Sequence, residues 1–176
     1  MKKIAFLGFA FLLCGLLSAS AQTQKIYWGD SVPKGWNGSW PAKFLTVPRG
    51  YLIPAELDYV VEKLRTHNIR VDMLTKPVKA TGEEFVIDKV GQARGGGTNM
   101  IKLEGGFAKS PLKEFPAGTF RVDLAQPMAN MAFYCLEPQA ADGFVGWGVL
   151  EPYFKSIGAD KRSVVYPIFK YFKIME

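Results

Sequence analysis

The stretch FPAGTFRVDLAQPMANMAFYCLEPQAADGFVGW, residues 115–147, carries the clearest structural pattern in the sequence. Its Pro-Ala-Gly triplet at 116–118 predicts a turn, because proline fixes φ and glycine tolerates positive φ. Residues 119–124 then alternate apolar and polar side chains, which is typical of a half-buried strand. The stretch closes on an aromatic segment, 144–147, that we expect to be buried. It therefore predicts a strand, a helix and a loop packed in one core.

The helix inside this stretch has clear limits. Pro127 lies in its first turn, where a missing N–H costs little, and Pro138 ends it. Four apolar residues recur at helical spacing and predict a buried stripe, namely Met128, Met131, Ala132 and Cys135. Cys135 belongs to this stripe, so we expect a buried thiol and not a reactive one.

Upstream, residues 49–54 predict a strand that runs directly into a helix opened by Pro54. Asn68 is suited to the left-handed conformation that ends helices. Residues 69–74 alternate and predict the next strand, so the two strands should be parallel with a right-handed crossover. The buried stripe of the helix between them is Leu57, Val60, Val61 and Leu64.

The remaining strands are predicted at 84–90 and 99–104, joined by a glycine-rich hairpin connection at 91–98. The apolar segments 144–150 and 152–157 favour a short helix docked on the sheet, and 164–168 a last strand. Because strands and helices interleave, we predict a single α/β domain with a mixed β-sheet flanked by helices, spanning 45–176.

The first 21 residues are typical of a signal peptide, with a basic start, an apolar run at 4–17 and an Ala-Ser-Ala cleavage site. We therefore expect export to the periplasm or the extracellular space. Lipoprotein anchoring at Cys14 is less favoured, because Leu13 precedes it where a small residue is expected. The apolar run is too short for a membrane-spanning helix.

Charge and cysteine content exclude several function classes. Without residues 1–21, the chain has 20 basic and 16 acidic residues, a net charge of +4 with no run of five like charges. Nucleic acid binding is therefore not implied. Only Cys135 would remain after cleavage, so no intramolecular disulfide can form.

No catalytic set emerges from the sequence. His67 is the only histidine, whereas a hydrolytic zinc site needs two or three imidazole or thiolate ligands. No nucleophile-elbow motif is present, and a Cys135–His67 dyad is disfavoured by the core position of the cysteine. We therefore predict no metal, no cofactor and no enzymatic activity, with a cryptic hydrolase as an alternative.

The segment 22–44 is rich in tryptophan and glycine and predicts little regular structure. Its aromatic residues either pack onto the domain or offer stacking faces to a sugar or peptide. Glycan binding through this cluster is a second hypothesis for function. The candidate binding residues are Trp36, Asn37, Trp40, Arg49, Glu137 and Asp142. For Glu137 and Asp142 the alternative is a structural role around Pro138.

Taken in order, several motifs resemble the region downstream of the catalytic domain in bacterial secreted zinc carboxypeptidase-like proteins. The resemblance covers most of residues 45–170. The motifs that carry it lie at 49–55, 64–71, 116–120, 126–130, 136–138 and 142–148.

This resemblance implies a free-standing copy of an accessory domain, similar in outline to an α/β amidotransferase-like fold without its nucleophile. The H-x-x-E zinc-binding pair of the family is absent here, so no metal ligand or catalytic residue carries over. The implied role is a secreted, non-catalytic binding module. Its partner would be a protein, a peptide or a cell-envelope glycan.

Overall fold

The structure, a computed structural model, describes residues 25–26, 45–95, 98–140, 142–159 and 163–175. The chain divides into two compact units, residues 1–47 and 48–176. In the first unit, β1 (Lys25–Ile26) pairs antiparallel with β2 (Leu45–Thr46). All other described elements belong to the second unit.

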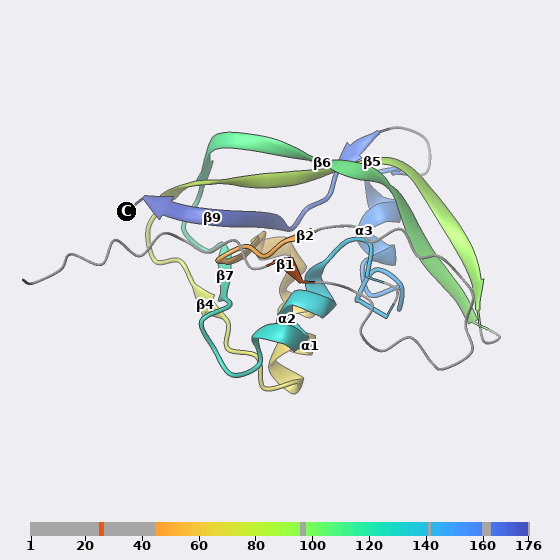
Figure 1. Ribbon diagram of the computed structural model, residues 1–176, viewed down its shortest axis with the longest axis horizontal. Coiled ribbons are helices and arrows are strands. Elements are labelled where there is room, and N and C mark those ends of the chain that lie inside the picture. The colour runs from red at the N-terminus through yellow and green to blue at the C-terminus, as the bar shows by residue number, and fades with distance from the viewer. Residues whose placement is uncertain (1–24, 27–44, 96–97, 141, 160–162, 176) are drawn as a thin grey trace, which may run out of the picture. The chain divides into compact units, whose positions relative to one another are not determined.

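The second unit is a single α/β domain built on a seven-stranded sheet, which confirms the predicted fold class (Figure 1). Within the described residues, the strand order is β4-β7-β3-β9-β5-β6, with β8 paired to β5, and every pairing is antiparallel. The sheet curls without closing into a barrel. Its strands are β3 (Gly50–Ile53), β4 (Asp72–Met73), β5 (Val78–Gly95), β6 (Thr98–Phe115), β7 (Phe120–Asp123), β8 (Val164–Val165) and β9 (Phe169–Met175).

The two strands on either side of the first helix, β3 and β4, are parallel as predicted but are not neighbours. Strand β7 lies between them and runs antiparallel to both. It can do so because the turn ending in Gly118, whose φ is +90°, returns the chain from β6 in a few residues. The predicted adjacent βαβ pair is therefore split by a later strand.

Strands β5 and β6 are much longer than the predicted segments 84–90 and 99–104. They pair along 18 residues each, from Val78↔Phe115 to Gly95↔Thr98. Register shifts between Ala80 and Gly82 and between Ile87 and Lys89 interrupt the ladder without ending it. Pro111 falls within the first shift, where a residue without an N–H is tolerated.

The first helix confirms the sequence pattern. A short 3-10 turn, η1 (Ala55–Leu57), leads into α1 (Asp58–Thr66), and the predicted stripe is at most 1% exposed. Asn68 has φ +58° and donates its N–H to Arg65 O, while Ile69 N–H reaches Leu64 O. This is a Schellman ending, with Leu64 and Ile69 both buried.

The second helix, α2 (Ala129–Leu136), buries a different arc from the one predicted. Met131, predicted to be buried, is 41% exposed, so this part of the prediction is wrong. Phe133 and Leu136 lie in the core beside Cys135 instead. The cause is rotational, because the buried arc of α2 passes through 132, 133, 135 and 136, which turns residue 131 toward solvent. Helix α3 (Glu151–Ser156) overlaps the predicted segment 152–157, but the last strand is β9 and not 164–168.

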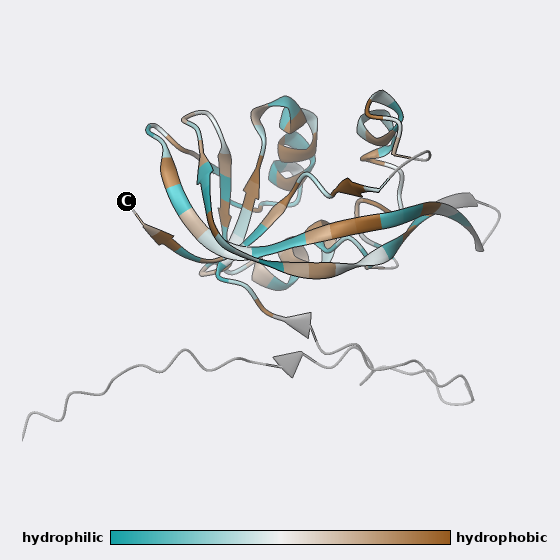
Figure 2. Cartoon of the chain, turned by 90° about the horizontal axis from the view of Figure 1, so that it is seen from above, coloured by the Kyte–Doolittle hydropathy of each residue, from teal (hydrophilic) through white to brown (hydrophobic). Residues whose placement is uncertain are grey.

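Both faces of the central strands are buried. The helix face carries Tyr51, Val122 and Lys170, and α2 lies against it; α1 covers the same side through Arg65 over the Phe120 ring (Figure 1). The opposite face, here called the inner face, carries Leu52, Phe169 and Tyr171, which form one core cluster with Leu74 and Phe115 from the two ends of the sheet. Apolar and polar residues alternate along the strands in Figure 2.

Candidate functional site

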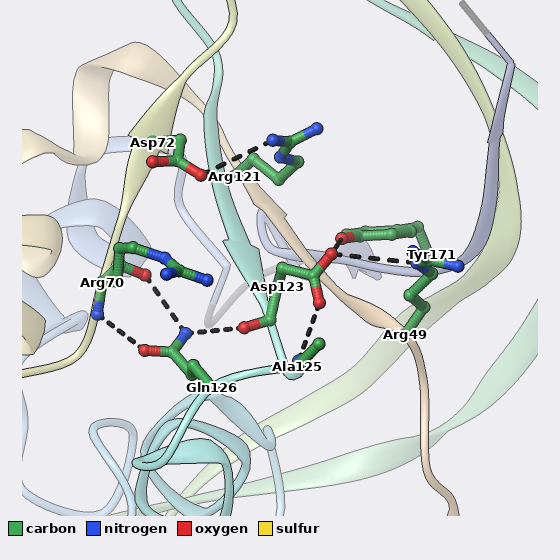
Figure 3. Close-up of polar contacts among 8 residues, drawn as sticks. All are labelled: Arg49, Arg70, Asp72, Arg121, Asp123, Ala125, Gln126 and Tyr171. Carbon is green, nitrogen blue, oxygen red and sulfur yellow. Dashed lines mark hydrogen bonds and ion pairs between the residues drawn. The ribbon is translucent and has the colours of Figure 1, made fainter.

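A polar network occupies one end of the inner face, centred on Asp123 at the end of β7 (Figure 3). Its Oδ2 lies 3.8 Å from Arg49 Nε and accepts a 3.4 Å hydrogen bond from Tyr171 Oη. Its Oδ1 accepts the Ala125 N–H at 2.7 Å, which holds the chain as it leaves the strand. We call this group, with the residues added below, the Asp123 network.

Gly50 makes the tyrosine contact possible. It pairs with both Asp123 and Tyr171 in the ladder, so the three positions share one face. A methyl group at Gly50 would lie 2.1 Å from Val122 O and 2.7 Å from Tyr171 Oη. The space is therefore filled by the tyrosine. Burial, followed by the Asp123 charge, raises the pKa of Tyr171, so the phenol remains a donor at neutral pH.

Gln126 joins the start of β4 to the end of β7. Its Oε1 accepts the Arg70 N–H at 2.7 Å, and its Nε2 donates to Arg70 O at 3.2 Å and to Asp123 O at 2.6 Å. One side-chain amide thus fixes the backbone of Arg70 beside that of Asp123 (Figure 3).

Two copies of the tripeptide Arg-Val-Asp, at 70–72 and 121–123, generate the charge pattern. In an antiparallel pair, identical R-x-D triplets place each arginine opposite an aspartate. The Asp72↔Arg121 pair follows this rule, with Arg121 Nη2 3.5 Å from Asp72 Oδ2. Sequence reasoning missed this repeat, although it was the available signal for Arg70, Asp72, Arg121 and Asp123.

The network contains more cation than anion. Its cations are Arg49, Arg70 and Arg121, and its anions are the carboxylates of Asp72 and Asp123. The Arg49 side chain is 67% exposed. Arg70 is exposed, and its guanidinium has no partner among the described residues. Each guanidinium offers five N–H donors in a planar fork that matches a carboxylate. The arrangement can therefore accept a further anionic group.

A second polar group lies on the helix face and is closed to solvent. Glu137, directly after α2, accepts the Tyr51 hydroxyl at 2.5 Å and forms a 2.8 Å ion pair with Lys170 Nζ. Both charged side chains are 2% exposed. Among the described residues, the ammonium makes no contact that meets hydrogen-bond geometry. It lies 3.9 Å from the centre of the Phe107 ring.

The surroundings of this buried pair keep its phenols protonated. Burial and the Glu137 charge raise the pKa of Tyr51 well above its usual value, and they act in the same way on Tyr166. The Tyr166 hydroxyl donates to Leu136 O at 3.2 Å, which fixes the end of α2. Glu137 therefore has a bracing role next to Pro138, the structural alternative weighed for it from the sequence.

The predicted binding residues are thus separated. Arg49 belongs to the Asp123 network, and Glu137 is 1% exposed in the interior. Asp142 is exposed and accepts a 3.4 Å hydrogen bond from Tyr134 Oη. The structure does not bring these three together. The candidates Trp36, Asn37 and Trp40 lie outside the described residues. Binding by any of the six remains a prediction.

Within the described ranges, no group of three or more His, Cys, Asp or Glu side chains is placed to hold a metal ion. Cys135 is buried, and burial raises the pKa of its thiol to about 11. No helix in the described part of the chain is long and apolar enough to span a membrane.

The fold and the network define an α/β domain with an arginine-rich polar surface. No family model matches the chain, and no solved structure matches it. The chain is similar to two fungal proteins named Carboxypeptidase 2, from Trichophyton tonsurans and Trichophyton equinum, with 29% identity over 107 residues in each. The alignment covers 58% of this chain and 19% of each relative. The similarity thus concerns one region of these carboxypeptidases, and the chain spans about a fifth of their length.

Proposed function

We propose that this chain is a non-catalytic binding module, related to a region of carboxypeptidases, that binds peptides through a carboxylate group at the Asp123 network. The observation that carries the proposal is the arginine excess, in particular Arg70, whose guanidinium has no partner in the described residues. Such a fork binds a carboxylate through two parallel hydrogen bonds.

The local similarity to Carboxypeptidase 2 supports peptides as the proposed class of ligand. The single histidine supports binding without turnover, because His67 cannot by itself form a hydrolytic zinc site. His67 is also exposed at the end of α1, where it serves as the C-cap residue.

Part of the site is preformed. Gln126 fixes the backbone of Arg70, and Arg49 Nε lies 3.8 Å from Asp123 Oδ2 on the other side. A backbone that is already fixed reduces the conformational entropy lost when the Arg70 side chain binds a ligand. The exposed arginines also provide a positive field that attracts anionic ligands.

The binding test uses a fluorescent peptide with a free C-terminal carboxylate and the same peptide amidated. We expect the full chain to bind the first, and Arg70→Gln to weaken binding about tenfold, the cost of one charged hydrogen-bonded contact. Arg65→Gln, an exposed arginine on α1, is the matched control and should bind like the parent chain. If Arg70→Gln bound the peptide as tightly as the parent chain, binding at the Asp123 network would be contradicted.

An activity test addresses the non-catalytic part separately. The purified chain, with and without added zinc, is incubated with peptides, and released C-terminal amino acids are measured. We expect no release above the buffer blank. Metal-dependent release of a C-terminal residue would overturn this part of the proposal.

Export is part of the same proposal and rests on residues 1–21 alone. Expression of the full chain in a bacterium, followed by N-terminal sequencing of the periplasmic and medium fractions, tests it. We expect a product that begins at Gln22. A product that retains Met1 in the cytoplasm would contradict export.

A further inference from the structure

Trp147 is 72% exposed, the highest value among the exposed large hydrophobic side chains of the described residues. The sequence pattern predicted a buried aromatic segment at 144–147, and for Trp147 this is wrong. Its neighbours Phe144 and Val145 are buried, at 6% and 1%. The chain therefore places two residues of this segment in the core and leaves the largest one in water, where its faces are available to a ligand.

The backbone around Trp147 is built to hold this position. The Trp147 N–H donates to Gly143 O at 3.1 Å, and the next two N–H groups return to Val145 O and Phe144 O at 3.0 and 2.9 Å. Gly148 has φ +72°, a conformation that residues with a side chain rarely adopt. Leu150, fully buried, anchors the far end. The indole is thus carried on a defined turn.

Polar groups flank the indole in the chain. On one side, exposed Asp142 accepts the Tyr134 hydroxyl at 3.4 Å. On the other, a methyl group added at Gly148 would lie 3.6 Å from Glu151 Oε2, and Glu151 pairs with Lys155 at 2.7 Å. Burial and the Asp142 charge raise the pKa of Tyr134, so its hydroxyl stays protonated.

We propose that Trp147, Asp142 and Glu151 form a binding site for a sugar ring. The flat indole face offers an apolar surface to the C–H groups of a pyranose, which desolvates both. The carboxylates of Asp142 and Glu151, five and four residues from Trp147 in the chain, can accept sugar hydroxyl protons, and the Lys155 ammonium can donate in return. This Trp147 site is distinct from the Asp123 network and does not depend on it.

A protein partner fits this surface less well. An aromatic hot spot in a protein interface lies among apolar contacts that exclude water. The flanking side chains here are charged, and the apolar neighbours Phe144, Val145 and Leu150 are already buried in the domain. An exposed indole with carboxylates and an ammonium close to it in the chain matches a polyhydroxylated ligand better.

The test is saturation-transfer NMR of the full chain with two probes, a β-linked glucose hexasaccharide and an N-acetylglucosamine hexasaccharide. We expect transfer to the ring C–H protons of at least one probe. Trp147→Ala should abolish it, and Asp142→Asn should weaken binding roughly fivefold, as expected for the loss of one hydrogen bond to a charged group.

Two control variants identify the source of any binding. Met131→Ala removes another exposed apolar side chain, and Trp36→Ala/Trp40→Ala removes two of the three tryptophans of the segment 22–44. Both should keep the transfer signal. Sugar binding that is lost only in the second variant, or that persists in Trp147→Ala, would overturn the Trp147 site, as would transfer to neither probe. If Trp147→Ala still binds the carboxylate-bearing peptide, the Asp123 network and the Trp147 site are independent of each other.

Discussion

The two faces of the central sheet carry the same polar arrangement in opposite environments. On the helix face, Glu137 receives a tyrosine hydroxyl and a lysine, and both charges are 2% exposed. On the inner face, Asp123 receives a tyrosine hydroxyl and an arginine, with side chains 22% and 67% exposed. Gly50 and Tyr51 are adjacent in β3 and lie on opposite faces. Gly50 is beside Asp123 and Tyr171, and Tyr51 contacts Glu137. Burial, and not the set of groups, therefore sets how much such a cluster contributes to stability, and the exposed cluster is the one that we propose for binding.

The buried cluster gives the largest expected effect. Lys170→Met removes the cation and leaves Glu137 charged in the interior beside Tyr51. We expect a loss of about 3–5 kcal/mol in the free energy of unfolding, the usual cost of an uncompensated buried charge. Urea denaturation followed by circular dichroism measures it.

The double variant Lys170→Met/Glu137→Leu is the control for this prediction. Because it removes both charges, it should recover most of the stability, although the Tyr51 hydroxyl loses its acceptor. A single variant that costs less than about 1 kcal/mol would mean that the pair behaves like a surface ion pair. In that case the contrast between the two faces would disappear.

Gly50→Ala tests the packing of the inner face beside Tyr171. The added methyl would meet Val122 O and Tyr171 Oη, so β3 or the tyrosine must move. We expect a loss of about 3 kcal/mol, at the upper end of overpacking effects. Gly106→Ala is the matched control, because a methyl there has no neighbour within 4 Å, and its stability should change little. Equal stabilities of the two variants would contradict the packing argument.

The sequence predicted the local structure of this domain better than its sheet. Periodicity located α1 with its stripe and its Asn68 ending, because those features depend on residues within one turn of each other. It shortened β5 and β6, since Gly82, Gly105 and Pro111 are turn residues in isolation but occur within a paired ladder here.

The candidate sites were harder to predict for a related reason. Arg49 was identified, but Arg70 and Asp123 are neighbours only because β7 enters between β3 and β4, a long-range pairing that hydrophobic periodicity does not encode. The repeated Arg-Val-Asp triplet was the single local trace of that pairing. Trp147 was predicted to be buried because aromatic residues usually are, but it is 72% exposed and is followed by Gly148, whose φ is +72°.

Cys135 offers an intermediate effect on the helix-face side. Burial raises its thiol pKa from 9.0 to about 11, so the native state favours the neutral form. The corresponding stability is present below pH 9 and is lost as the pH rises through about 11, amounting to about 3 kcal/mol when complete. Cys135→Ala lacks this term, so its stability should fall less steeply between pH 9 and 11. Parallel curves for the two proteins would contradict a dry environment for the thiol.

Arg49→Ala should have the smallest effect on folding and so completes the comparison. Its contact with Asp123 is 3.8 Å long and the side chain is 67% exposed, so solvent screens most of the attraction. We expect a change below about 0.5 kcal/mol in the free energy of unfolding, reduced further in 0.5 M salt. The same variant should weaken binding of the carboxylate-bearing peptide, because a cation that contributes little to the fold keeps its donors for a ligand. If Arg49→Ala instead destabilised the domain by more than about 1.5 kcal/mol in urea unfolding, the exposed network would be part of the fold, and the division of roles between the two faces would not hold.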